Sequence, residues 1–175
     1  MKAKLIKAIS IVVVALSGMA ATIAFAQTAT TSFQVQAQVN TNCVVSATNL
    51  TFSTPYDGAS GTPNDSGAST IDVRCTKDAP FAVALNVGSV TGAIFANRRM
   101  FNGTDYMNYN LYRDSARTEV WGDGTSSTFT VAGTGAGLGA PQAIILDVYG
   151  RIPINQTLLS PGAYTEPTIT VTVSY

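Results

Sequence analysis

The side chains with the potential for chemistry in this chain are two cysteines and ten carboxylates, because the chain has no histidine. Without histidine, the sequence excludes a Ser-His-Asp or Cys-His arrangement and any histidine-ligated zinc or haem. Hydrolysis by a pair of carboxylates stays open, since acidic side chains far apart in sequence can meet in space. The acidic residues are Asp57, Asp65, Asp72, Asp78, Asp105, Asp114, Glu119, Asp123, Asp147 and Glu166.

Most of these carboxylates stand beside Gly, Asn, Ser or Pro, where aspartate is favoured for the local hydrogen bonds of turns. The glycine-rich run 133–139 lacks the Gly-Lys-Ser/Thr ending of a phosphate-binding loop and is typical of a flexible loop. Asp123 lacks the alternating acidic ligands of a calcium-binding loop. We therefore expect no enzyme activity, no cofactor and no metal site.

The first 26 residues have the pattern of a secretory signal peptide. Three lysines precede an apolar run, and Ala24-Phe25-Ala26 fits the small-x-small cleavage pattern. The predicted mature chain begins at Gln27 and has 175 − 26 = 149 residues, enough for one domain with its own core. We expect export to the periplasm and beyond.

Cleavage at that point changes the charge of the protein. The signal segment holds three of the ten basic residues and no acidic one, so the mature chain has 10 − 3 = 7 basic against 10 acidic residues, a net charge of −3. A nucleic acid partner is then not expected, because phosphate binding needs a basic face. A charged fraction of only 11% with many Ser, Thr and Asn indicates a β-rich extracellular protein.

Cys43 and Cys75 both lie in the exported part of the chain. An even number of cysteines in an oxidising compartment predicts one disulfide bond. The alternatives are two free buried thiols, or a zinc site, which two thiols without histidine cannot complete except with carboxylates.

After Cys43 the chain has the pattern of short strands separated by turn-rich loops, with no sustained helical period. Loops are expected over 54–69 and 133–141, and few helices anywhere. This pattern predicts an all-β sandwich. Arg98 and Arg99 are expected at a solvated loop tip, with a basic adhesive patch as the alternative. The predicted strands are 44–52, 70–76, 81–87, 106–112, 128–131, 142–149 and 168–175.

The segment Phe33–Val39 has the alternation of a half-buried strand, with Phe33, Val35, Ala37 and Val39 on one face and glutamines on the other. No charged residue occurs between Gln27 and Tyr56, whereas exposed edge strands are normally guarded by lysine, proline or a bulge. The strand either pairs inside its own sheet or is kept adhesive for another molecule. The pattern alone favours the internal strand.

The end of the chain alternates in the same way. Its apolar face consists of Ile169, Val171, Val173 and Tyr175, and termini usually fray unless they are tied into a sheet. The two ends of the predicted domain are therefore two places where pairing between molecules is expected.

The middle and end of the chain resemble the spore coat protein U domain, the family to which the subunits of archaic chaperone/usher pili belong. The resemblance covers residues 43–175. One departure is Glu166-Pro167, since proline has no N–H for a ladder and leaves the start of the last strand open. The blocks that carry the resemblance are Tyr109-Asn110-Leu111-Tyr112-Arg113-Asp114, Ala116-Arg117-Thr118, Val120-Trp121-Gly122-Asp123-Gly124, Val148-Tyr149-Gly150-Arg151-Ile152-Pro153, Pro161-Gly162-Ala163-Tyr164 and the last six residues.

The resemblance implies an incomplete immunoglobulin-like β-sandwich that is completed by a donor strand from a neighbouring subunit. Residues 27–42 would be the donor extension and residues 43–175 the pilin domain. Phe33, Val35, Ala37 and Val39 would be the donor side chains. Ile169, Val171, Val173 and Tyr175 would border the acceptor groove and the chaperone contact.

The function implied is that of a structural subunit of a secreted surface fibre that supports adhesion and biofilm formation. Its partners would be identical or related subunits in a head-to-tail polymer, a periplasmic chaperone and an outer-membrane usher. Two alternatives remain at this point: a secreted protective coat protein built by the same exchange, and a monomeric carbohydrate-binding sandwich whose first strand pairs within its own chain. In the second alternative, Trp121 and the tyrosines Tyr106, Tyr109 and Tyr112 would line a sugar site.

Overall fold

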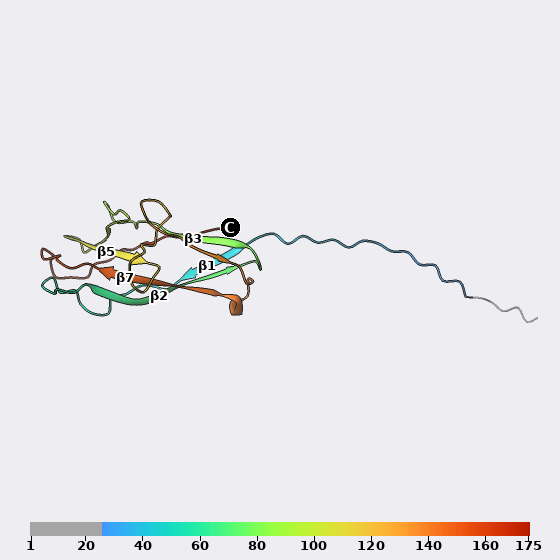
Figure 1. Ribbon diagram of the computed structural model, residues 1–175, viewed down its shortest axis with the longest axis horizontal. Helices are drawn as coiled ribbons and strands as arrows, with labels where there is room; N and C mark the ends of the chain where they lie inside the picture. Colours follow the sequence, from blue (N-terminus) through green and yellow to red (C-terminus); the bar gives the residue numbers. More distant parts are fainter. Residues whose placement is uncertain (1–25) are drawn as a thin grey trace, which may run out of the picture. The chain divides into compact units, whose positions relative to one another are not determined.

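The structure is a computed structural model that describes residues 26–175, and it divides the chain into two units, Met1–Ala37 and Gln38–Tyr175. In the first unit the described residues, 26–37, carry no helix or strand and all are exposed (Figure 1). The predicted signal peptide lies outside the described residues except for Ala26, and it stays a prediction. No helix among residues 26–175 is long and apolar enough to cross a membrane.

The second unit is built from eight strands and one short 3-10 turn at Ala140–Gln142 (Figure 1). Within the described residues this confirms the all-β class that the sequence predicts. The strands are β1 (Cys43–Ala47), β2 (Asn64–Cys75), β3 (Pro80–Leu85), β4 (Arg98–Phe101), β5 (Tyr106–Tyr112), β6 (Val131–Thr134), β7 (Ile144–Ile152) and β8 (Val171–Ser174).

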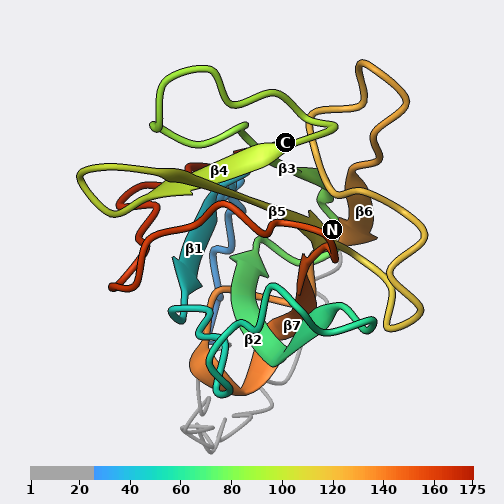
Figure 2. The same ribbon diagram turned by 90° about the vertical axis from the view of Figure 1, so that its left-hand side faces the viewer.

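The strands form two antiparallel sheets that pack as a sandwich. One sheet has five strands in the order β1-β2-β7-β5-β4, and Figure 2 shows β1, β2 and β7 side by side in it. The other sheet has three strands in the order β6-β3-β8. Each sheet therefore ends in two edge strands: β1 and β4 in the first, and β6 and β8 in the second.

The core lies between the sheets and follows the two-residue period of the central strands. On β2 the inward residues Ile71, Val73 and Cys75 are at most 2% exposed, and on β3 the inward residues Phe81 and Val83 are at most 4% exposed. Because successive side chains of a strand point to opposite faces, every second position of β2 and β3 is removed from water.

Several strand boundaries differ from the sequence-based prediction. The prediction for 106–112 is confirmed residue for residue by β5. Strand β2 begins six residues earlier than predicted, at Asn64, so the expected loop 54–69 is wrong over its last part. Strand β6 includes Gly133, which was expected in a loop; a Cβ there would overlap the ring of Phe81, so the strand needs glycine at this point.

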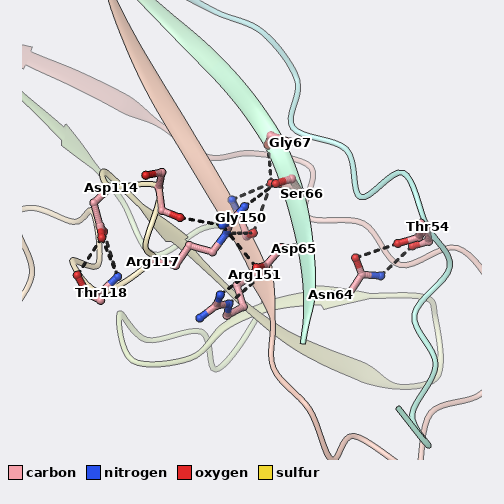
Figure 3. A network of polar contacts seen from close by, with 11 residues as sticks. Thr54, Asn64, Asp65, Ser66, Gly67, Asp114, Arg117, Thr118, Gly150 and Arg151 are labelled. Atoms are coloured by element: carbon pink, nitrogen blue, oxygen red, sulfur yellow. Dashed lines mark hydrogen bonds and ion pairs between the residues drawn. The ribbon is translucent and has the colours of Figure 1, made fainter. Parts of the chain in front are cut away.

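A polar network explains the early start of β2 (Figure 3). The ladder between β2 and β7 shifts register between Asp65 and Ala68, which marks a β-bulge. Arg117 donates from Nη2 to the carbonyl oxygen of Ser66 at 2.7 Å and from Nε to that of Gly150 at 3.1 Å. These bonds occupy carbonyl oxygens that the bulge takes out of the ladder, so a glycine- and serine-rich segment stays a strand.

Candidate functional site

The candidate site lies where the two sheets end on the same side of the sandwich. Strand β1 ends the five-stranded sheet, strand β8 ends the three-stranded sheet, and the two strands contact each other. Each of them has one strand partner, β2 for β1 and β3 for β8. The edge of each strand that faces away from its partner is free of any ladder within residues 26–175.

On β1 the inward side chains are poorly covered. Val45 pairs with Val73 and Ala47 pairs with Ile71, so they share the inward face of those core residues. Val73 is fully buried, but Val45 is 39% exposed and Ala47 is also exposed. The core is thus closed at β2 and uncovered one strand further out.

Strand β8 repeats this difference in the other sheet. Val173 pairs with Val83 and Val171 pairs with Leu85, and both partners on β3 are buried. Val171 and Val173 are only half-buried, as is Ile169, which precedes them on the same face. We call the five residues Val45, Ala47, Ile169, Val171 and Val173 the open seam.

The backbone groups of the open seam point outward along the free edges. Asn86 donates its N–H to the carbonyl oxygen of Thr170 at 3.1 Å, so the backbone of Thr170 faces β3. Because backbone direction alternates along a strand, the N–H and C=O groups of Val171 and Val173 face away from β3.

The same alternation applies to β1. The carbonyl oxygen of Asn42 accepts the N–H of Thr76 at 2.9 Å, and the N–H of Thr48 donates to the carbonyl oxygen of Thr70 at 2.9 Å. The even-numbered residues therefore face β2, and the backbone of Val45 and Ala47 faces the free edge. An extended segment placed between β1 and β8 would find unpaired donors and acceptors on both sides and apolar side chains beneath it.

The open seam carries no charge. The strand sequences Cys-Val-Val-Ser-Ala and Val-Thr-Val-Ser contain no Lys, Arg, Asp, Glu or Pro. Edge strands that must not recruit another chain usually carry such residues. Both edges are therefore chemically suited to pairing.

The predicted disulfide bond is confirmed. Cys43 is bonded to Cys75, and the two residues are also opposite each other in the ladder between β1 and β2. The bond fixes the beginning of β1 to the buried face of β2. It thereby sets the position of Val45, two residues further along the same face.

The structure brings three of the four predicted acceptor residues, Ile169, Val171 and Val173, to the open seam. Tyr175 is 59% exposed and lies beyond the last residue of β8. Sequence reasoning missed Val45 and Ala47 as members of the site. Their signal was the alternation Cys43, Val45, Ala47, which places them on the face of the disulfide.

The four predicted donor residues lie outside every strand of the structure. Phe33, Val35 and Val39 are 86%, 81% and 81% exposed, and Ala37 is exposed as well. No residue from 26 to 42 is assigned to a strand. The assignment of these residues to donor or internal strand stays a prediction.

Most of the carboxylates considered for catalysis accept hydrogen bonds from nearby loops, hydroxyls or arginines, as Asp114 and Asp123 illustrate. Asp114 accepts the hydroxyl of Thr118 at 2.8 Å (Figure 3). It also accepts the N–H of Glu119 at 2.8 Å. Asp123 accepts the N–H and the hydroxyl of Thr125. Burial raises the pKa of the Asp114 carboxyl, but the hydrogen bonds from Glu119 and Thr118 outweigh it, so this pKa lies below its ordinary value.

The expectation of a solvated loop tip at Arg98 is wrong. Arg98 is fully buried on β4. Its guanidinium donates to the carbonyl oxygens of Asn86 (Nη2, 2.8 Å) and Trp121 (Nη2, 2.7 Å) and to Oδ1 of Asn110 (Nη1, 2.6 Å). Burial lowers the pKa of Arg98 to about 10, so the side chain stays charged at neutral pH and is compensated by these oxygens.

This geometry defines a β-sandwich that is uncovered along one side. Three comparisons place it among known proteins. Residues 29–172 match the Spore Coat Protein U domain, and since this match covers most of the chain, the chain belongs to the Spore Coat Protein U domain family. The resemblance inferred from the sequence is thereby confirmed.

A relative and a solved structure illustrate the family and the fold. Protein U from Myxococcus xanthus is 32% identical over 118 residues, which are 62% of this chain and 60% of that protein. The crystal structure of a chaperone–tip adhesion subunit pre-assembly complex (CsuC–CsuE) from archaic chaperone-usher Csu pili of Acinetobacter baumannii matches with a TM-score of 0.53 at 21% identity, over 78% of this chain and 40% of that chain. The similarity to the Csu structure shows a shared fold.

Proposed function

We propose that the protein is a subunit of a chaperone-usher type surface fibre, assembled by donation of an extended strand from one copy into the open seam of the next. The observation that carries this proposal is the pair of free edges at β1 and β8, with half-covered apolar side chains on their inward faces. The fold similarity to a pilus subunit captured with its chaperone supports it.

The proposed donor is the segment Phe33–Val39 of a neighbouring copy. Its apolar residues recur at every second position, which is the period needed to place them over Val45, Val171 and Val173 while the glutamines face water. Burial of one Phe, two Val and one Ala would contribute about 5 to 8 kcal/mol, before the ladder hydrogen bonds and the cost of ordering the arm.

Strand donation of this kind produces a fibre. The donor and the acceptor are different surfaces of the same chain, so the contact is heterologous and does not close on itself. An unfilled seam would aggregate in transit, which supports a periplasmic chaperone and an outer-membrane usher as partners. Adhesion and biofilm formation would follow from the fibre at the cell surface.

Removal of the donor tests the proposal. A chain without residues 27–39 should still form a soluble complex with the chaperone but should give no fibres by electron microscopy. A matched control replaces residues 27–31, which precede the alternating segment, with Gly and Ser, and it should assemble. If the chain without residues 27–39 formed fibres, strand donation would be refuted.

A coat layer built by the same strand exchange is a second candidate, favoured by the family to which the chain belongs. Electron microscopy of the producing cell separates thin fibres from a continuous layer. Both forms would be lost in the chain without residues 27–39.

A further inference from the structure

The leading end of β8 is held by side chains in addition to one backbone hydrogen bond, which joins Asn86 and Thr170. Upstream of Val171 the chain contains Pro167, which has no N–H to donate. Thr165 still pairs with Phe101, at the end of β4 in the five-stranded sheet, whereas Thr170 bonds to Asn86 after β3 in the other sheet. Residues 165–170 therefore cross between the sheets just before the free edge begins.

The carboxylate of Glu166 anchors this crossing. Its Oε1 atom accepts the N–H of Ser89 at 3.0 Å, the hydroxyl of Ser89 at 2.6 Å and the N–H of Thr168 at 2.9 Å, and its Oε2 atom accepts the N–H of Val90 at 3.0 Å. Ser89 and Val90, in the loop after β3, thus donate three hydrogen bonds to the carboxylate of Glu166. No ion pair involves Glu166 within residues 26–175, so these hydrogen bonds compensate its charge.

The side chain of Asn86 completes the anchor. Both Nε and Nη2 of Arg98 donate to the carbonyl oxygen of Asn86, at 3.1 and 2.8 Å, so that oxygen is already engaged. Oδ1 of Asn86 instead accepts the N–H of Thr170 at 2.9 Å. The same Oδ1 atom accepts the N–H of Gly88 at 3.2 Å, so the Asn86 side chain links β8 to the loop after β3.

The anchor is in direct contact with the open seam through Gly88. This residue has φ +103°, and a Cβ on it would lie 2.5 Å from Oε2 of Glu166 and 3.3 Å from Cδ1 of Ile169. The backbone of Gly88 thus packs against both the carboxylate of Glu166 and Ile169 of the open seam. Burial raises the pKa of the Glu166 carboxyl, but the hydrogen bonds from Ser89, Thr168 and Val90 outweigh it and hold that pKa below its ordinary value.

We propose that Glu166 is a positioning residue for strand acceptance, which fixes Ile169 and the free edge of Val171 before a donor strand arrives. The inference rests on the proposed function and identifies Glu166 as the residue that positions the β8 edge of the open seam. An edge strand with one neighbour frays at its leading end unless it is tied down, and a frayed edge would have to be ordered during binding. The anchor moves that ordering cost from the binding step to folding.

Association of a labelled donor peptide with the full chain tests this role. The probe is a peptide of residues 27–39, in large excess so that it outcompetes neighbouring copies, and the rate is measured by stopped-flow fluorescence. In Glu166→Gln an amide NH₂ faces a backbone N–H that needs an acceptor, so the association rate should fall about tenfold. Amide hydrogen exchange of residues 168–173 should accelerate while that of β5 stays unchanged.

Two further variants make the test specific. Asp114→Asn is the matched control, because Asp114 also accepts hydrogen bonds on both oxygens from a nearby loop; its association rate should equal that of the original chain. Ser89→Ala removes one hydroxyl donor and, as a milder change that preserves folding, should slow association about threefold.

The outcomes distinguish a positioning role of Glu166 from a purely structural one, and they distinguish failure of this inference from failure of the proposed function. A merely structural role for Glu166 would lower the midpoint of urea unfolding and leave the association rate per folded molecule unchanged. A rate for both Glu166→Gln and Ser89→Ala within twofold of that of Asp114→Asn would overturn the inference and leave strand donation intact. Failure of the original chain to bind the peptide would instead refute the proposed function.

Discussion

The two sides of the sandwich are built differently. On the side opposite the open seam, the segment 119–122 of the same chain links the two sheets. Trp121 donates its backbone N–H to the carbonyl oxygen of Leu111 on β5 at 2.9 Å, and its Nε1–H to the carbonyl oxygen of Val83 on β3 at 3.0 Å. Gly122 accepts the N–H of Leu85 at 3.1 Å. We call this region, with the buried Arg98 and Trp121, the closed seam.

The closed seam indicates what the open seam lacks. On the closed side the chain supplies its own backbone partners to both sheets, and the large side chains beneath them are fully buried. On the open side no segment of residues 43–175 lies between β1 and β8, and Val45, Val171 and Val173 stay partly exposed. The chain thus supplies a segment that links the two sheets on one side, and it supplies none between β1 and β8 among residues 43–175.

A charge directed into the open seam should have the largest effect. Val45→Glu would place a carboxylate under the donated strand, where an unpaired buried charge costs several kcal/mol, so fibres should be abolished. Monomer stability should change by under about 1 kcal/mol, because Val45 is partly exposed before assembly. Electron microscopy measures the first effect and urea unfolding the second.

Val44 provides the control for that change. It is the preceding residue, it is 44% exposed compared with 39% for Val45, and it points to the opposite face of β1. Val44→Glu should assemble as the original chain does. Equal loss of fibres in both variants would show that charge on β1, and not the inward face, is what matters.

Truncation of Trp121 in the closed seam should have the reverse pattern. Trp121→Ala removes a fully buried side chain and leaves a cavity, so it should cost about 3 to 5 kcal/mol of folding free energy. Trp121→Phe retains most of the ring and loses the Nε1 hydrogen bond to Val83, so it should cost less. The measurement is urea unfolding of the monomer; a change confined to assembly would contradict the closed-seam assignment.

Some parts of this comparison follow from local sequence and others do not. The strand 106–112 and the pairing of Cys43 with Cys75 depend on alternation and on cysteine number, which the sequence displays directly. Val45 and Ala47 were missed because their exposure depends on β1 being the last strand of its sheet, and strand order is not a local property.

Arg98 was misplaced for a related reason. A charged residue is surface-exposed by default, and its burial here requires carbonyl and amide oxygens from Asn86, Asn110 and Trp121, which lie in three separate segments. Only the folded arrangement brings those acceptors together. The sequence therefore predicts the all-β class and the strand 106–112, and it does not predict which polar side chains close the core.

Loss of the disulfide bond should have the next largest effect, a loss of folding stability on the side of the open seam. The bond closes a loop with a sequence separation of 32 residues, and the chain-entropy model gives about 3 to 4 kcal/mol for such a loop. The double variant Cys43→Ser and Cys75→Ser should lose that much stability in urea unfolding. Because Cys43 begins β1, association of the donor peptide should slow as well. A loss of stability with an unchanged association rate would show that the disulfide bond does not position the open seam.

The smallest effect on stability is expected from substitution of Asp65, which lies at the start of β2. The hydrogen bond from Arg151 (Nε to Oδ1, 2.7 Å) outweighs burial and, with Arg117 nearby, lowers the pKa of the Asp65 carboxyl. A carboxyl whose pKa is lower in the folded chain contributes stability above its ordinary pKa of about 4, and this contribution is lost as the pH falls through the folded value.

Asp65→Asn should therefore be less stable than the original chain at neutral pH, and the difference should shrink below about pH 4. Because both partners are about one-third exposed, with side-chain accessibilities of 31% and 33%, the difference at pH 7 should stay under about 1 kcal/mol. Urea unfolding from pH 7 to pH 3 measures it, with Asp147→Asn as the control for removal of one charge. A difference that grows in acid would reverse the sign and show that the ion pairs of Asp65 do not stabilise the bulge.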